Sequence, residues 1–146
     1  MTYNFDDTIA MVKYTNQKDE RHLDAIKQFL YLAPNLMFLK DYSPDADGKY
    51  VLISREWERT YSMKRDEVLG HTDFELFPKP TADKKRLDDL HTIQFERVVT
   101  VVDLNGTRYN SFKPTKMALI PIKVAGEEKF TYIAGMAISP MPQWQE

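Results

Sequence analysis

The chain has 146 residues, with 42% hydrophobic, 29% charged and 12% aromatic residues, the composition of one ordinary folded domain. Its net charge of −2 is spread over mixed acidic and basic residues, so we expect neither a nucleic acid nor a membrane as partner. The absence of cysteine excludes disulfides, thiolate nucleophiles and thiolate metal sites. The N-terminus lacks the basic start and apolar run of a signal peptide, and we interpret the protein as cytoplasmic.

The first third of the chain predicts a helix followed by a hairpin. Apolar residues recur at helical spacing over residues 17–33 and Pro34 ends the run, which predicts an amphipathic helix. The segment LMFLKDY at 36–42 predicts a short strand and YVLIS at 50–54 a second one. The turn residues of SPDADGK join them.

Two helical segments come next. Residues 55–70 have a helical pattern that ends at a glycine. Thr72 and Glu75 then have the spacing of a capping box. This box predicts a new short helix in which Phe74 and Phe77 lie three residues apart and both point inward.

A longer helix and three strands complete the prediction. Residues 81–97 carry a stripe of helical period that includes Leu87, His91 and Phe95. The pattern then alternates, and VVTVVDL is expected to pair with TRYNSF across a two-residue turn at Asn105-Gly106. The segment KFTYIAGMAIS supplies the last strand.

This order of elements resembles the PAS domain family. The matching segments are LMFLKD, DGKYVLIS, the helical cluster from EWERTY to ELFP, and YIAGMAIS. The resemblance implies an α+β fold: a five-stranded antiparallel sheet with short helices and one longer helix on one face, plus the N-terminal amphipathic helix. We divide the chain into an N-terminal extension with that helix (1–33), the PAS domain (34–140) and a tail (141–146). The last strand departs from the family, since Ser139 and Pro140 stand where an aspartate, an apolar residue and a threonine are usual.

PAS domains are mostly sensory or interaction modules, so the resemblance implies a bacterial signalling domain with a small-molecule cavity between the sheet and the helices. Strand alternation and helix faces predict the side chains that line it. Gly135 and Ala137 would leave room for the ligand. The effector would be a histidine kinase or a diguanylate cyclase. The predicted ligand-binding residues are Phe38, Ile53, Trp57, Phe74, Phe77, Leu87, His91, Tyr109, Ser111, Ile133, Gly135 and Ala137.

No cofactor is expected. Asp73 stands at about the position where the blue-light flavin branch of the family has its cysteine, so a flavin adduct is excluded. Haem would need His91, but the resemblance places the axial histidine nearer Lys85. Metal-ligand clusters and the glycine-flanked serine of a nucleophile elbow are absent from the sequence. We therefore do not expect an enzyme, which would need His91 and Asp73 as an inward acid–base pair, whereas Asp73 is expected to be exposed.

Two functions remain open: a ligand-binding sensor, and a dimerisation or interaction scaffold with a filled core. In both, the outward-facing residues of the last strand form an apolar row that must be covered, and the N-terminal helix is the expected cover. We predict a homodimer through this face. Its interface residues are Ile26, Phe29, Leu30, Met136 and Ile138.

Overall fold

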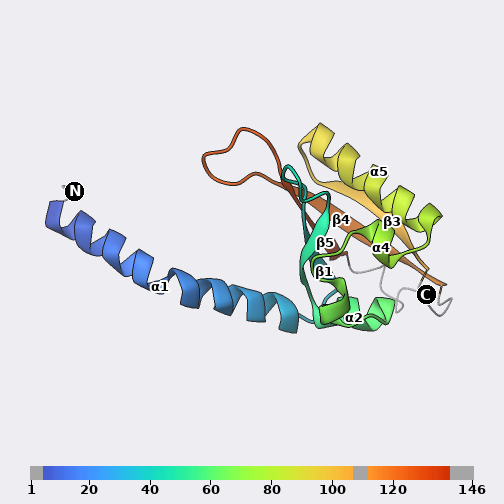
Figure 1. The fold of residues 1–146 in the computed structure, drawn as a ribbon, viewed down its shortest axis with the longest axis horizontal. Coiled ribbons are helices and arrows are strands. Elements are labelled where there is room, and N and C mark those ends of the chain that lie inside the picture. Colours follow the sequence, from blue (N-terminus) through green and yellow to red (C-terminus); the bar gives the residue numbers. More distant parts are fainter. Residues whose placement is uncertain (1–4, 107–111, 139–146) are drawn as a thin grey trace, which may run out of the picture.

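The computed structural model describes residues 5–106 and 112–138, with side chains for 19–103 and 115–138, as an α+β domain (Figure 1). One antiparallel sheet has the strand order β2-β1-β5-β4-β3. This confirms the predicted fold class. The strands are β1 Met37–Asp41, β2 Lys49–Ile53, β3 Val99–Gly106, β4 Phe112–Ile122 and β5 Tyr132–Ala137. The helices are α1 Phe5–Leu32, α2 Arg55–Tyr61, α3 Arg65–Val68, α4 Asp73–Leu76 and α5 Lys79–Phe95.

A shift in register between β1 and β2 decides which residues of β2 face the helices. Phe38 pairs with Ile53 and Lys40 pairs with Tyr50, with an irregularity after Leu39. Such a bulge changes the alternation of side chains. Tyr50 and Ile53 are therefore both buried, while Val51 between them is 36% exposed.

The helical region differs from the prediction at one point. The single helix expected over 55–70 is two helices, α2 and α3, because Ser62 adopts a left-handed conformation (φ 56°) that ends α2. The Ser54 hydroxyl caps the start of α2 by accepting from the Trp57 N–H at 3.3 Å. The capping-box spacing is confirmed, since the Thr72 N–H donates to Glu75 Oε1 at 3.1 Å at the start of α4.

The predicted two-residue turn at Asn105-Gly106 is wrong, although β3 does pair antiparallel with the strand that follows it, β4. Both residues belong to β3 and pair across to β4, with Gly106 opposite Phe112. The expected strand TRYNSF falls mostly on residues 107–111, outside the described residues, and β4 is instead the following segment, up to Ile122. This strand was not predicted because it contains two prolines, Pro114 and Pro121, which are unusual inside strands. Pro121 is tolerated because it lies beyond the end of β3, where β4 is paired on one side only, with β5.

Helix α1 does not cover the outer face of the sheet, as had been expected. It begins twelve residues earlier than predicted, at Phe5 instead of residue 17, and extends away from the sheet (Figure 1). Its C-terminal end contacts the domain, where the Tyr31 hydroxyl donates to Glu58 Oε1 at 2.7 Å. Its side chains Ile26 and Phe29 are 54% and 70% exposed. A single chain therefore leaves the apolar row on β5 without the predicted cover.

The apolar core lies between the inner face of the sheet and helices α2 to α5. Trp57 is at its centre, with ring centroids 5.3 Å from Tyr50, 4.5 Å from Tyr61 and 6.2 Å from Phe77. Such tilted and edge-on ring contacts are favourable beyond the area that they bury. This aromatic cluster anchors α2 and α4 to the sheet.

Candidate functional site

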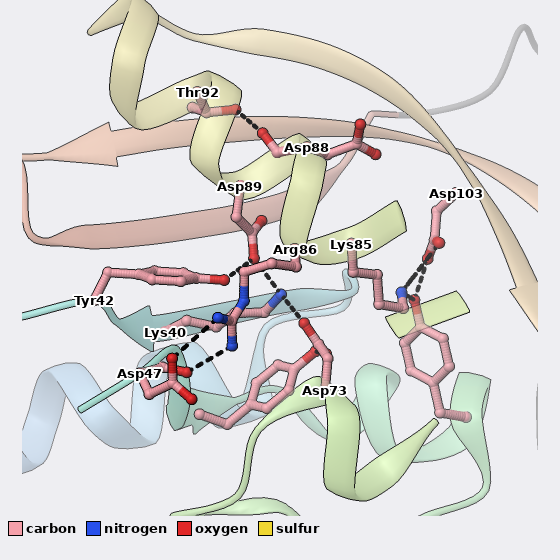
Figure 2. Close-up of polar contacts among 12 residues, drawn as sticks. Lys40, Tyr42, Asp47, Asp73, Lys85, Arg86, Asp88, Asp89, Thr92 and Asp103 are labelled. Carbon is pink, nitrogen blue, oxygen red and sulfur yellow. Dashed lines mark hydrogen bonds and ion pairs between the residues drawn. The ribbon is translucent and has the colours of Figure 1, made fainter. Parts of the chain in front are cut away.

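The inner face of the sheet carries a buried group of charges beside the aromatic core. Lys40 on β1 is 2% exposed, Asp73 at the start of α4 is 3% exposed and Asp89 on α5 is 1% exposed. The Lys40 ammonium lies 2.6 Å from Asp73 Oδ2 and 2.7 Å from Asp89 Oδ2 (Figure 2). One cation therefore joins a strand and two helices.

Two tyrosines complete the hydrogen bonding of this group. The Tyr50 hydroxyl donates to Asp73 Oδ1 at 2.6 Å, and the Tyr42 hydroxyl donates to Asp89 Oδ2 at 2.6 Å. Buried charges persist in proteins when they are paired and hydrogen-bonded in this way. We call these five residues the Lys40 network: Lys40, Tyr42, Tyr50, Asp73 and Asp89.

The pKa directions in the Lys40 network follow from burial and from charge. Burial alone would lower the pKa of Lys40, but the attraction of Asp73 and Asp89 outweighs it, so that pKa is raised. Burial raises the pKa of Asp73, but the charges of Lys40 and Lys85 outweigh it and the pKa is lowered. The pKa of Asp89 is raised, first by burial and then by the negative charge of Asp73, against the opposing effect of Lys40. The two carboxyls are thus electrostatically unequal.

A second ion pair lies along the same helix. Lys85 on α5 donates to both carboxylate oxygens of Asp103 on β3 at 3.0 Å, and the Tyr61 hydroxyl donates to Asp103 Oδ2 (Figure 2). The Lys85 ammonium also lies 4.8 Å from the centre of the Phe77 ring, a favourable cation–π distance. Between this pair and the Lys40 network there is a cavity of only about 20 Å³. That volume holds about one water molecule.

On the apolar side of the interior, the space that was expected to hold a ligand is filled by the Phe38 ring. Gly135 pairs with Phe38 across the β1–β5 ladder. A Cβ atom added at Gly135 would lie 2.2 Å from Phe38 Cζ, because the ring covers the glycine. The room that Gly135 was predicted to leave for a ligand is therefore occupied by Phe38.

The structure divides the twelve predicted ligand-binding residues into three groups. Seven lie on the inner side of the domain, either in the buried core or packed against it: Phe38, Ile53, Trp57, Phe77, Ile133, Gly135 and Ala137. Their role in binding a ligand stays a prediction. Tyr109 and Ser111 lie outside the described residues.

The placement of Phe74, Leu87 and His91 on the inner wall is wrong. Phe74 is 44% exposed and Leu87 is 54% exposed, and the His91 ring is exposed 5.9 Å from the Phe95 ring. The reason is that α5 turns its polar face inward. The residues of α5 that face the core recur at helical spacing, and they are Ala82, Lys85, Asp89 and Thr92.

Phe74 is turned outward because its neighbour Asp73 points inward to Lys40. On a helix, adjacent residues lie about 100° apart, so both cannot face the core. Phe74 instead packs under the Arg86 guanidinium, 4.9 Å from the ring centre. The expectation that Asp73 is exposed is therefore wrong, and with His91 outside, the two do not form an acid–base pair.

Sequence reasoning missed the Lys40 network, although one signal for it was present. Lys40 lies two residues after Phe38 in a predicted strand, so it shares the inward face. An inward lysine requires buried carboxylates near it. The partners could not be found, because Asp73 and Asp89 are 33 and 49 residues away from Lys40 in sequence.

The outer face of the sheet carries an apolar groove. Its volume is about 220 Å³. Leu30 at the end of α1 and Met136 on β5 are both among its lining residues. The groove is lined by Leu30, Met37, Phe38, Leu39, Ile120, Ile122, Ala134, Gly135 and Met136.

Neither a metal centre nor a membrane span is found in the part of the chain that the structure describes. No three His, Asp or Glu side chains there converge as metal ligands would. No helix in that part has the length and hydropathy needed to cross a bilayer. His91, the residue considered for haem, is exposed on α5.

Comparison with solved structures identifies the fold. The PAS domain of an HTR-like protein from Haloarcula marismortui matches with a TM-score of 0.61 at 16% identity, over 86% of this chain and 98% of that one. The LOV domain of a blue-light-activated histidine kinase from Erythrobacter litoralis matches with a TM-score of 0.56 at 19% identity, over 72% and 94%. VqmA bound to DPO matches with a TM-score of 0.64 at 20% identity, over 82% and 57%.

The chain therefore has the PAS fold, as its sequence motifs predict. No protein-family model matches the sequence, and no curated protein matches it by sequence. At these identities the comparison shows the fold, and function must be argued from the side chains.

Proposed function

We propose that this chain is a signalling module that acts as a homodimer through the outer face of its sheet, with a closed, charged interior. Solved structures with the same fold include a domain of a light-activated histidine kinase, which supports a signalling role in general. The observation that carries the proposal is the contrast between the two faces of the sheet. The inner face has a cavity of about 20 Å³ and the outer face a groove of about 220 Å³.

The outer groove has the features of a self-association surface. It is apolar, and the exposed side chains of α1 beside it include Ile26 and Phe29. A volume of about 220 Å³ accommodates a large apolar side chain, and in a two-fold dimer each chain would offer the same groove and the same helix to the other. We propose that Ile26, Phe29, Leu30, Met136 and Ile138 form this interface.

Multi-angle light scattering tests the dimer. Met136→Glu places a charge in the groove and is expected to convert the dimer to a monomer at the same protein concentration, because a buried unpaired charge is costly. Gln94→Glu, on the exposed side of α5, is the matched control and should stay dimeric. A dimeric Met136→Glu variant, or a monomeric wild-type protein, would overturn this interface.

The closed interior is tested separately by native mass spectrometry. The related fold of VqmA is known in a complex with DPO, so a small ligand is the competing interpretation. We expect the native and denatured masses of one chain to agree, since the cavity found among the described residues of the interior has room for about one water. A reproducible excess mass that is lost on denaturation would refute the closed interior and restore the ligand-binding sensor.

A further inference from the structure

An open groove lies where the end of α1 meets α2, away from the residues of both sites described above. Its volume is about 440 Å³, within the usual range for small-molecule sites. Tyr31 from α1 and the buried Met63 give it an apolar side. The groove is lined by Tyr31, Arg55, Glu58, Arg59, Ser62, Met63 and Lys64.

The charge of this groove is positive. Three of its lining residues are cations and Glu58 is the one acid. Both oxygens of Glu58 are already engaged: Oε1 accepts from the Tyr31 hydroxyl at 2.7 Å, and Oε2 accepts from the Arg65 backbone N–H at 2.7 Å. Arg65 adds a further positive charge at its edge, with the guanidinium 5.3 Å from the centre of the Tyr31 ring.

Arg55 is the unusual member of the groove. Its Nε is buried and has no hydrogen-bond partner among the described residues. In the same part of the chain neither Arg55 nor Lys64 has a carboxylate within 4.0 Å, whereas the cations of the interior, Lys40 and Lys85, are both paired. A buried donor without an acceptor costs free energy. Arg55 therefore has no anionic acceptor among the side chains that the structure describes.

We propose that this groove binds a small organic anion that carries phosphate or carboxylate groups. The planar guanidinium of Arg55 presents paired donors to such a group. Lys64 adds positive charge beside it, whereas Arg59 is already paired with Glu56. The apolar side formed by Tyr31 and Met63 suits the organic part of the ligand. Since Tyr31 belongs to α1 and Arg55 to α2, the anion would bridge these two helices.

Isothermal titration calorimetry at constant ionic strength tests this site with two probes, pyrophosphate and citrate. We expect at least one of them to bind saturably at one site per chain. The probe that binds more tightly shows whether the groove prefers phosphate or carboxylate groups. Arg55→Gln should weaken that binding about tenfold or more, the loss expected for one charge-assisted contact. Lys84→Gln, an exposed lysine on α5, is the matched control and should bind as the wild type does.

Lys64→Gln provides a second variant, because Lys64 is exposed and its replacement should not affect folding. It should also weaken binding, by severalfold. Failure of both anions to bind, or equal binding by Arg55→Gln, Lys64→Gln and Lys84→Gln, would overturn the site. Binding of a hexaglutamate peptide with no binding of either small anion would also overturn it, and would assign the groove to an acidic protein segment.

Discussion

The Lys40 network can be tested by removing its single cation with Lys40→Met. The side chain that replaces the lysine is similar in length but uncharged, so Asp73 and Asp89 would remain buried without the ammonium that lies 2.6 and 2.7 Å from them. Breaking a buried ion pair from one side typically costs about 3–5 kcal/mol. The variant is therefore expected to lose a large part of the stability of a domain of this size.

The same magnitude follows from protonation. Without Lys40, a buried carboxyl can avoid its unpaired charge by taking up a proton, which at pH 7 costs about 4 kcal/mol for a group with an ordinary pKa of about 3.9. At pH 5 the same step costs only about 1.5 kcal/mol. In the variant the folded carboxyl has a raised pKa, so the folded state binds more protons than the unfolded state, and lowering the pH restores stability.

Urea denaturation followed by circular dichroism at pH 7 and pH 5 measures both effects. At pH 7 we expect a loss of about 3–5 kcal/mol, or a midpoint lower by about 2 M for a typical slope, and at pH 5 a clearly smaller loss. Lys84→Met, which breaks the exposed pair with Asp88, is the control and should change stability by less than about 0.5 kcal/mol. A loss below about 1 kcal/mol at pH 7, or an equal loss at both pH values, would refute the electrostatic account.

Three further predictions concern the core and one helix end. Burial first, and then the charge of a neighbouring aspartate, raise the pKa values of Tyr50 and Tyr61, so stability should fall above pH 10, where unfolded tyrosines ionise. Absorbance at 295 nm should show these two ionising only as the circular dichroism of the fold is lost, and ionisation of all eight tyrosines in the native state would contradict this. Gly135→Ala should lower stability by about 1–3 kcal/mol in urea, because its Cβ would meet the Phe38 ring, and an unchanged midpoint would show that the ring moves freely. Glu96→Gly should raise stability by up to about 1 kcal/mol by thermal unfolding, since Glu96 ends α5 with a φ of 54°, and a lower Tm would argue against backbone strain there.

The fold could be predicted largely from local sequence. Alternation identified β1, β2 and β5, and the Thr72–Glu75 spacing identified the start of α4, because these signals depend on neighbours within a few residues. The prediction of β4 failed for the same reason. Asn105-Gly106 is a strong local turn signal, but the pairing of Val99 with Leu119 and onward to Gly106 with Phe112 continues the ladder through it.

The inward face of α5 could not be chosen from the sequence. A stripe of Leu87, His91 and Phe95 is the more apolar side and predicts the core-facing side. The helix instead turns Lys85 and Asp89 inward, because Asp103 and Lys40 on the sheet need partners of opposite charge. Charge pairing between distant elements thus decided what hydrophobic periodicity alone predicted wrongly.

Local sequence was enough to predict the PAS order of elements, the absence of cysteine chemistry, and the inward placement of Trp57 and Phe77. The burial of Tyr50 beside them depended on the register shift between β1 and β2. The packing of the described part of the interior depends instead on contacts between distant segments. Phe38 covers Gly135 across the β1–β5 pairing, and Lys40 meets Asp73 and Asp89 from two helices. Whether a cavity exists depends on how side chains from distant segments fill a shared volume, and this packing is fixed when the sheet and helices come together.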